Sequence, residues 1–520
     1  MNLALEYLTL EHLTPEHVTQ KTDDRQTRYN KPTWHAMTEA TPTNLVEHDI
    51  QPEDTLAFIH VPKAGGVTLG ALIDPMWLPG ARCPVYMTLP LARFSREQIA
   101  SYRSFIGHFN YSALAQLLPG KFKCITMLRH PFSRQLSFLR MLKRLGESAA
   151  EGTTPPVLEQ IGNPFFRQIF EQANLEGSEH TLHAWREKPL EVLVEDEDLQ
   201  KKFGLLNGQV LQLTPLRPVA GRLPDQPGLS QGEIEQMLLE SARDNLANML
   251  GFGLQECFQD SLYLLSFLFG WRPLPDALRM NEAPHPLVHG NLPPGVLDRL
   301  EKYNELDLQL YDHASALFEQ RFRRMTDTLL ERYGNRQQVR LTRPLPADVM
   351  DELLDKHYRS RLQSKNPAGY TGTSSTFTFD QAVSAALGWH RREISPGQGS
   401  FRWTGPGRQS SIDLFPLPGG DIQLQLVICN AVKPGLVDDI IISIHGEMLP
   451  CASSSTEGET LLQCVIPRSL VMHAPYLRIG ILVPETISPH SLDSSNPDIR
   501  QLGVAVNRIN QEIIHQEENS

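Results

Sequence analysis

The chain has 520 residues, of which 40% are apolar and 21% are charged, and these are ordinary values for a folded globular protein. This length allows about two to four domains, and the composition excludes a mainly disordered protein. The sequence contains no run of eighteen or more apolar residues, so an integral membrane segment is not expected. The net charge of −12 argues against a surface built to coat nucleic acid, and no nucleic-acid partner is expected.

The first residues of the chain and the cysteines indicate the cellular compartment. The first residues have no basic flank and reach Glu6 before an apolar stretch forms, so they lack the layout of a secretory signal. The six cysteines are scattered and include no C-x-x-C pair, which is typical of reduced thiols rather than of a zinc site; only Cys451 and Cys464 are candidates for pairing. These features predict a cytoplasmic protein.

The N-terminal part of the chain has the pattern of an α/β domain. Residues 1–50 are polar and are interpreted as an extension. From residue 51 to residue 335, short apolar runs alternate with longer amphipathic ones, which predicts buried strands and packed helices. The expected strands are 56–59 and 123–128, and the expected helices are 131–145, 231–250, 257–269 and 296–325.

The C-terminal part has a different pattern. Residues 336–372 are rich in charged and turn residues and are interpreted as a linker. Residues 373–520 contain short β-rich runs between clusters of Gly, Pro and Ser, which predicts an antiparallel β-sandwich. Its expected strands are 401–404, 411–415, 422–428, 440–444, 461–466, 476–483 and 502–506.

A candidate phosphate-binding loop follows the first expected strand. The strand runs into a Pro-Lys-x-Gly-Gly turn and then into the start of a helix. Glycines allow the backbone to approach an anion closely, amides of the first helical turn point at it, and Lys63 adds a mobile charge. Because the lysine precedes the glycines, the loop does not match the G-x-x-x-x-G-K-[ST] motif of kinases and GTPases. The alternative interpretation is a Gly-Gly turn with an exposed lysine.

A second strand, turn and helix form a second candidate anion site. Arg129 ends the strand, Pro131 fits the first helical position, and Ser137 lies farther along the helix with Arg134. Residues 98–146 contain no Asp or Glu, and such a basic stretch in an acidic protein predicts a negatively charged ligand. A surface helix with unrelated arginines is the alternative. The basic residues of this stretch are Arg103, Lys121, Lys123, Arg129, Arg134, Arg140, Lys143 and Arg144.

The two motifs in this order, PK-x-GG and LR-x-P-x-x-R-x-x-S, resemble the paired phosphate motifs of sulfotransferases that use 3′-phosphoadenosine 5′-phosphosulfate (PAPS), in the carbohydrate 2-O-sulfotransferase-like branch. Further matching blocks lie at 106–109, 206–213, 253–262 and 304–311, so the resemblance covers residues 55 to 325. It implies a three-layer, P-loop-like domain with a parallel sheet. The runs 388–393 and 401–406 resemble accessory β-domains of bacterial enzymes that make glycans.

The resemblance also implies roles for individual residues. Arg129 and Ser137 would bind the 3′-phosphate, and the first loop would bind the 5′-phosphosulfate. The family usually has Thr or Ser at positions 64 and 67, so this chain lacks two hydroxyls there, and His130 stands where Asp or Asn is common. These departures leave a catalytically degenerate, glycan-binding relative as an alternative. The residues of the first loop are Lys63, Ala64, Gly65, Gly66, Val67, Thr68 and Leu69.

Sulfuryl transfer requires in-line attack, a base near the acceptor and positive charge on the leaving phosphate, much as phosphoryl transfer does. Lys63 is the candidate for stabilising charge on the bridging oxygen, because it is the only cation of the first loop. His108 is the candidate base, since imidazole titrates near neutral pH and the family places a histidine base in this segment. His60 is its competitor. No metal is expected, because the fixed cations can neutralise the donor.

These observations predict a PAPS-dependent sulfotransferase that acts on a hydroxyl of a carbohydrate, either a polysaccharide or a glycolipid. The alternatives are a sulfotransferase-fold protein that only binds glycan and a nucleotide-dependent kinase. In the sandwich, Trp389, Trp403 and Tyr476 are either sugar-stacking platforms or core residues. Family members in animals are Golgi membrane proteins; because no anchor is visible here, a bacterial, cytoplasmic enzyme is expected.

Overall fold

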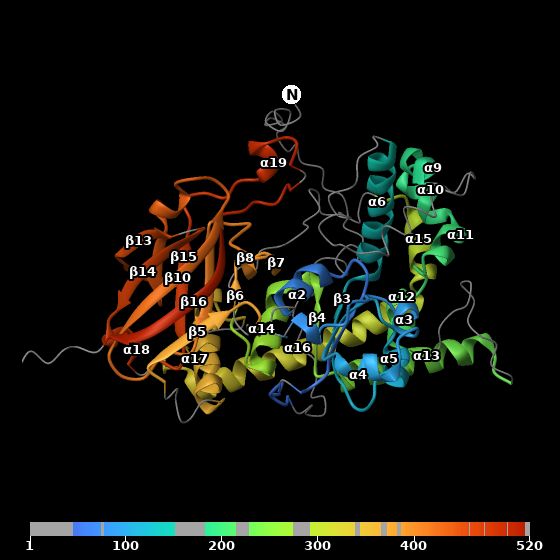
Figure 1. Ribbon diagram of the computed structural model, residues 1–520. Coiled ribbons are helices and arrows are strands. Elements are labelled where there is room, and N and C mark those ends of the chain that lie inside the picture. The colour runs from blue at the N-terminus through green and yellow to red at the C-terminus, as the bar shows by residue number, and fades with distance from the viewer. Residues whose placement is uncertain are drawn as a thin grey trace, which may run out of the picture.

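The computed structural model contains a parallel sheet with its helices and two antiparallel sheets, joined by a long helix (Figure 1). The expected extension lies outside the described residues as far as residue 44, and the segment between α6 and α9, residues 151–181, also lies outside them. The described residues are 45–51, 53–73, 77, 79–150, 182–214, 228–273, 292–338, 344–365, 372–381, 386–456, 458–472, 474–496 and 498–514.

The parallel sheet has four strands in the order β2-β1-β3-β4, and all neighbouring pairs are parallel. Nearly every residue of these strands is buried, because helices cover both faces, as is usual for parallel sheets. The expected α/β class is therefore confirmed. The strands are β1 (Leu56–His60), β2 (Ser104–Gly107), β3 (Lys123–Leu128) and β4 (Gly251–Leu254).

The helices around this sheet begin at recognisable caps. Ser95 and Gln98 form a capping box at α4, and Ser230 and Glu233 form one at α13. None of the described helices is long and apolar enough to cross a membrane. The helices up to the first antiparallel strand are α2 (Gly66–Ile73), α3 (Thr88–Leu91), α4 (Arg96–Ser101), α5 (Tyr111–Leu117), α6 (Pro131–Ala150), α9 (Leu182–Glu187), α10 (Leu190–Glu195), α11 (Glu197–Lys202), α12 (Gly208–Leu213), α13 (Gln231–Asn248), α14 (Phe258–Phe269), α15 (Pro294–Tyr303), α16 (Glu305–Tyr333) and α17 (Ala347–Lys365).

The expected continuous helix over residues 296–325 is wrong, because the chain breaks at Asn304 between α15 and α16. Asn304 leaves helical geometry, with φ −124° and ψ 23°. Its buried side-chain amide donates to the carbonyl of Leu300 (2.8 Å) and to the side chain of Gln135 on α6. The break therefore depends on a distant partner, which apolar periodicity cannot reveal.

The C-terminal residues form two antiparallel sheets, in the orders β13-β14-β10-β16-β8-β7, with β5 also on β16, and β12-β11-β15-β9-β6. Buried residues of both sheets share one core, so the sheets pack face to face, and each expected strand overlaps an observed one. The strands are β5 (Ser374–Thr378), β6 (Ala386–Leu387), β7 (Glu393–Ser395), β8 (Gly399–Trp403), β9 (Gln409–Leu414), β10 (Asp421–Ala431), β11 (Ile441–Ile444), β12 (Glu447–Leu449), β13 (Cys451–Thr456), β14 (Glu459–Ile466), β15 (Leu477–Leu482) and β16 (Val504–Ile514).

The segment expected to be a linker, residues 336–372, contains α17, which contacts both parts of the protein. On one side His357 Nε2 lies 3.0 Å from the carbonyl of Phe267 in α14. On the other side Tyr358 donates to Asp413 of β9 (3.2 Å), and Asp413 also pairs with Arg272, just after α14 (3.3 Å). Figure 1 shows α17 between the antiparallel sheets and the end of α16. The two parts are thus connected by a packed helix and by a buried carboxylate.

Two of the three candidate stacking aromatics of the sandwich are buried, and the third is partly buried. Trp403 and Tyr476 are buried. Trp389 packs against the sandwich core and donates from Nε1 to the carbonyl of Ser411 (3.0 Å). Trp403 and Tyr476 are therefore not exposed stacking platforms, and Tyr476 packs with Tyr358 and Leu362 of α17.

Candidate functional site

The two candidate phosphate motifs meet at the carboxyl edge of the parallel sheet. Lys63 follows β1, and Arg129 follows β3, which is the hydrogen-bonded neighbour of β1. Arg129 donates from Nη1 to the backbone carbonyl of Lys63, at 2.9 Å. The carboxyl edge is the usual position of ligands in open α/β sheets. A single arginine thus connects the two segments that the sequence suggested separately.

The side chain of Lys63 extends from the first loop to helix α6. Its backbone is left-handed, with φ 69°, and its Nζ donates to the sulfur of Met141 on α6 (3.8 Å). Burial lowers the pKa of Lys63 to about 8, and the charges of Arg144 and Arg129 contribute to this shift. An ammonium group in this position is a poorly solvated cation surrounded by other cations, which favours binding of an anion.

In the rest of the first loop, the groups that can bind an anion are backbone amides rather than side chains. The side chains of Ala64, Thr68 and Leu69 are buried, and Gly65 is left-handed with φ 77°. Helix α2 begins at Gly66, and the first turn of a helix has amides without helical acceptors. Amides with this geometry can bind the oxygens of a phosphate or sulfate.

Arg129 is held from several sides. Gln209 of α12 clamps its backbone, with the amide of Arg129 donating to Gln209 Oε1 (3.0 Å) and Gln209 Nε2 donating to the carbonyl of Arg129 (2.8 Å). Its Nε lies 4.0 Å from Glu256 Oε1 and is buried, with no hydrogen-bond partner in the described part of the chain. The Arg129 side chain is still 23% exposed, so the open side of the guanidinium, away from Glu256, can bind an anion.

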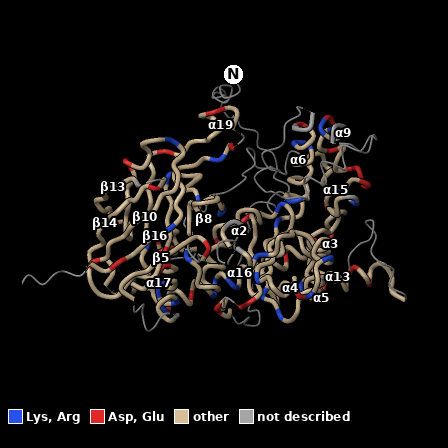
Figure 2. The backbone as a smooth tube through the Cα atoms, viewed as in Figure 1, with Lys and Arg blue, Asp and Glu red and all other residues tan. Residues whose placement is uncertain are grey.

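Ser137 lies on the partly open face of α6, whereas Arg134 does not. Ser133, Ser137, Arg140 and Arg144 are spaced by three or four residues and are all partly or fully exposed, so they share one face. Figure 2 marks the basic positions along this helix. Arg134 is instead buried, donates to the carbonyl of Leu205 (2.9 Å) and pairs with Asp307 of α16 (3.4 Å). Arg134 therefore contributes to the packing of the helices and not to an open anion site.

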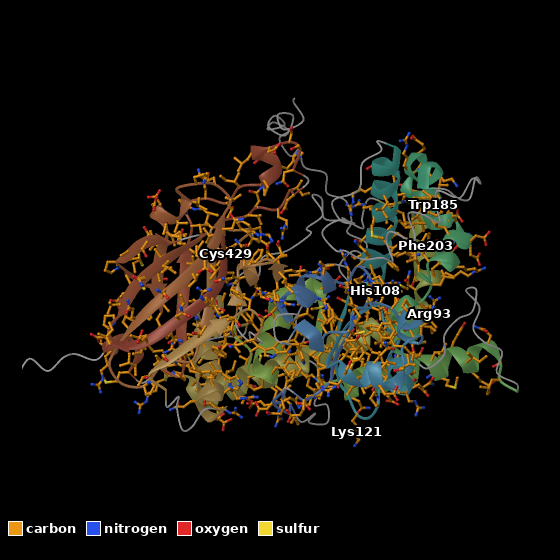
Figure 3. All side chains as sticks on the ribbon, viewed as in Figure 1. Arg93, His108, Lys121, Trp185, Phe203 and Cys429 are labelled. Carbon is orange, nitrogen blue, oxygen red and sulfur yellow. The ribbon has the colours of Figure 1, made fainter. Side chains whose placement is uncertain are left out.

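His108 lies directly after β2, at the same edge of the sheet. In Figure 3 it lies near the base of α6. Its Nδ1 is 2.7 Å from the carbonyl of His60, and a carbonyl can only accept, so Nδ1 carries the proton and Nε2 carries the lone pair. Burial lowers the pKa of His108, the bond to the carbonyl partly opposes this shift, and the charge of Lys63 lowers the pKa further. The imidazole is thus a neutral base at neutral pH.

The competing base, His60, packs within the site rather than opening into it. Its ring stacks on Phe58 and lies 4.5 Å from the ring of His108. Burial lowers the pKa of His60 well below its ordinary value, and the neighbouring His108 and Lys63 lower it further. Its backbone carbonyl also accepts from Gln212 Nε2 (3.0 Å). His60 therefore orients His108, which is the better candidate for the base.

Residues that were given no role from the sequence complete the site. Glu256 accepts from the backbone amide of His130 (2.9 Å) and from the hydroxyl of Tyr311 (2.7 Å). Together with Gln209, these residues come from the three blocks at 206–213, 253–262 and 304–311, which matched the family without an assigned function. In the structure, Gln209, Glu256 and Tyr311 all lie around Arg129. Within the part of the chain that the structure describes, no group of three His, Cys, Asp or Glu side chains could hold a metal ion.

Comparison with known proteins identifies carbohydrate sulfotransferases as relatives. No family model matches the chain. The chain is 27% identical to heparan-sulfate 6-O-sulfotransferase 1 of Homo sapiens over 302 residues, which is 53% of this chain and 68% of that protein. It is 26% identical to heparan-sulfate 6-O-sulfotransferase 1-B of Danio rerio over 306 residues (53% and 69%). It is also 26% identical to human heparan-sulfate 6-O-sulfotransferase 2 over 356 residues (61% and 52%).

These relatives support an enzyme of the carbohydrate sulfotransferase family, a class for which PAPS is the implied donor. They are named as 6-O-sulfotransferases, so the 2-O-like branch is not confirmed. The expectation of a bacterial, cytoplasmic enzyme is contradicted, because the relatives are vertebrate heparan-sulfate enzymes and animal members of the family are Golgi proteins. That expectation was drawn from the composition and the first residues of the sequence, and strands and helices of the same fold form in either compartment.

Proposed function

We propose that this protein is a sulfotransferase that moves the sulfuryl group of PAPS to a hydroxyl of a carbohydrate acceptor. The observation that carries the proposal is the hydrogen bond from Arg129 to the carbonyl of Lys63, because it brings the two phosphate motifs of the chain into one site. The catalytic machinery is assigned to residues 51–335, with a P-loop-like fold, and the β-sandwich at residues 373–520 is assigned an accessory role.

The described residues fit an anionic nucleotide with two separated acidic groups. The partly exposed guanidinium of Arg129 fits a 3′-phosphate on the side away from Glu256, with Ser137 on the partly open face of α6 as a further donor. The amides of Gly66, Val67 and Thr68 at the start of α2, together with Lys63, fit the 5′-phosphosulfate. Backbone amides can do so without the hydroxyls that Ala64 and Val67 lack.

Lys63 and His108 perform the chemical steps in this proposal. The bound donor supplies an activated sulfuryl group, which the acceptor oxygen attacks in line with the leaving phosphate. His108 accepts the proton of the acceptor hydroxyl at Nε2, since its Nδ1 proton is held by the carbonyl of His60. Lys63 stabilises the negative charge that develops on the leaving oxygen, which typically is worth about 10²–10³ in rate for one donor.

The acceptor is proposed to be a polysaccharide of the heparan-sulfate type, sulfated at a 6-hydroxyl. Two observations support this: the names of the relatives, and the basic residues Arg140 and Arg144 on the face of α6 next to Lys63, which suit an acidic glycan. A protein that only binds glycan is not favoured, because Lys63, His108 and Arg129 lie together at one sheet edge.

The test is calorimetric titration of the full chain with PAP, the product of the donor, and with AMP and ATP as controls. We expect binding of PAP, clear discrimination against AMP, and no need for a metal ion. Arg129→Ala should weaken PAP binding by about 2–4 kcal/mol, whereas Arg93→Ala should not, because Arg93 is an exposed arginine (Figure 3). Equal affinity for PAP and AMP in the wild type would overturn the proposed function. Sulfuryl transfer from PAPS to heparan sulfate is the accompanying activity assay.

A further inference from the structure

A buried carboxylate faces the guanidinium assigned to the 3′-phosphate. Glu256 Oε1 accepts from the backbone amide of His130 (2.9 Å) and lies 4.0 Å from Nε of Arg129. Its other oxygen, Oε2, accepts from the hydroxyl of Tyr311 (2.7 Å). Both Glu256 oxygens are therefore fixed by donors, and the carboxylate has one defined orientation toward Arg129.

This carboxylate is costly for a site that binds anions. Burial raises the pKa of Glu256, and the contacts with Tyr311, the amide of His130 and Arg129 act in the opposite direction. A negative charge near a phosphate weakens phosphate binding unless it contributes something else. Here it offsets the buried charge of Arg129 and restrains the Nε side of the guanidinium, which leaves Nη1 for the carbonyl of Lys63.

The elements that carry this carboxylate are packed against the first phosphate loop. Glu256 lies in a 3-10 turn, Gln255–Cys257, between β4 and α14. A Cβ atom on Gly65 would lie 3.2 Å from Cγ of Gln255 and 3.3 Å from the ring of Phe258. Tyr311 comes from α16 and is 7% exposed. The turn therefore has little freedom to move relative to Lys63 and Gly65.

We infer that Glu256, held by Tyr311, is a positioning residue that fixes Arg129 so that one guanidinium both binds the 3′-phosphate and supports the carbonyl of Lys63. The inference rests on the proposed function. Through this chain of contacts, a donor with a 3′-phosphate stabilises the loop that carries the catalytic lysine, whereas a nucleotide without that phosphate does not. Glu256 and Tyr311 thereby determine donor specificity without touching the donor.

The experiment measures the dissociation constants of PAP and AMP by calorimetry, with the full chain as wild type, Glu256→Ala, Glu256→Gln and Tyr311→Phe. Glu256→Ala should weaken PAP binding by about tenfold or more, because Arg129 loses the carboxylate that lies 4.0 Å from its Nε, while AMP affinity stays within about threefold. Glu256→Gln keeps the volume and the acceptor for His130 and should recover part of the loss. Tyr311→Phe should weaken PAP binding by about three- to tenfold.

The matched control is Tyr303→Phe. Tyr303 is also a buried tyrosine, but its hydroxyl has no hydrogen-bond partner among the described residues, so its removal should leave the affinity for PAP unchanged. The inference is overturned if Glu256→Ala preserves the ratio of PAP to AMP affinity, or if both affinities fall together, which would indicate general damage to the nucleotide site. If Glu256→Ala does not fold, unchanged ratios in Glu256→Gln and Tyr311→Phe overturn it. A wild type that does not prefer PAP to AMP would instead refute the proposed function.

Discussion

A Cβ atom added to Gly66 would overlap the imidazole ring of His60, because this ring packs directly on the first residue of α2. The second glycine of the loop is thus required by the side chain at the end of β1. Gly66→Ala should displace His60, whose carbonyl orients His108, and overpacking of this kind costs about 1–3 kcal/mol.

Urea unfolding and PAP titration check this prediction. Gly80→Ala is the control, since nothing lies within 4 Å of a Cβ atom at that glycine. A Gly66→Ala variant with wild-type stability and wild-type affinity for PAP would show that the loop can accommodate the methyl group.

Lys63→Ala should reduce turnover by about 10²–10³, because it removes the cation that stabilises the leaving oxygen. The measurement is single-turnover transfer from PAPS to heparan sulfate, with circular dichroism to confirm the fold. Lys121→Ala is a suitable control, as Lys121 is exposed and lies far from His108 in Figure 3. Near-normal transfer by Lys63→Ala would remove this residue from the mechanism.

The pH dependence of kcat/KM for PAPS should be bell-shaped. His108 must be neutral to accept a proton, and its pKa is lowered by burial, so activity should rise with pH on a limb below the ordinary histidine value of 6.5. Lys63 must be charged, and its pKa is about 8, so activity should fall above that pH. Lys63→Arg should shift the alkaline limb upward, and His108→Gln should remove the acid limb; an unchanged profile in both variants would contradict the assignments.

The buried pair of Arg134 and Asp307 should be important for stability. Asp307 also accepts from the backbone amides of Gln209 and Val210 at the start of α12. Asp307→Ala leaves the guanidinium buried without its partner and should lower the free energy of unfolding by about 3–5 kcal/mol. The control on the same helix is Glu319→Ala, which removes a more exposed pair with Arg323 and should cost about 0.3–0.5 kcal/mol. Urea unfolding of the two variants compares them, and equal effects would argue against a structural role for the buried pair.

Mild oxidation should join Cys451 and Cys464. The two residues are directly opposite each other on the antiparallel strands β13 and β14, and neither is in a disulfide. A hydrogen bond from Cys464 lowers the pKa of Cys451 and favours its thiolate. Oxidised glutathione would take up the two electrons, giving one protein disulfide, two reduced glutathione molecules and a mass loss of about 2 Da.

Intact-mass analysis measures this change. Cys451→Ser should abolish it, whereas Cys429→Ser should not, because Cys429 is buried and its sulfur faces the carbonyl of Ala505. Persistence of both free thiols in the wild type after oxidation would refute the pairing.

Much of the site could be predicted from local sequence. The strands β1 and β3 are short and apolar, the turns after them contain Lys63 with two glycines and Arg129 with Pro131, and strand ends of a parallel sheet meet at one edge. The seven expected strands of the sandwich also overlap observed strands, since alternation of apolar residues is a local property. These features can be predicted because they depend only on residues that are neighbours in the sequence.

The remaining features depend on contacts between residues far apart in the chain. Asn304 breaks a helix through its hydrogen bond to Gln135. Arg134 is buried because it pairs with the buried carboxylate of Asp307. Glu256 and Tyr311 come together beside Arg129 only because the turn before α14 and helix α16 pack next to it. The sequence by itself determined β1, β3, the seven expected strands of the sandwich and the charged groups after β1 and β3, because periodicity and turn chemistry are local. Only the tertiary structure decided which buried charges pair, since the energy of a buried charge depends on the partners that packing brings to it.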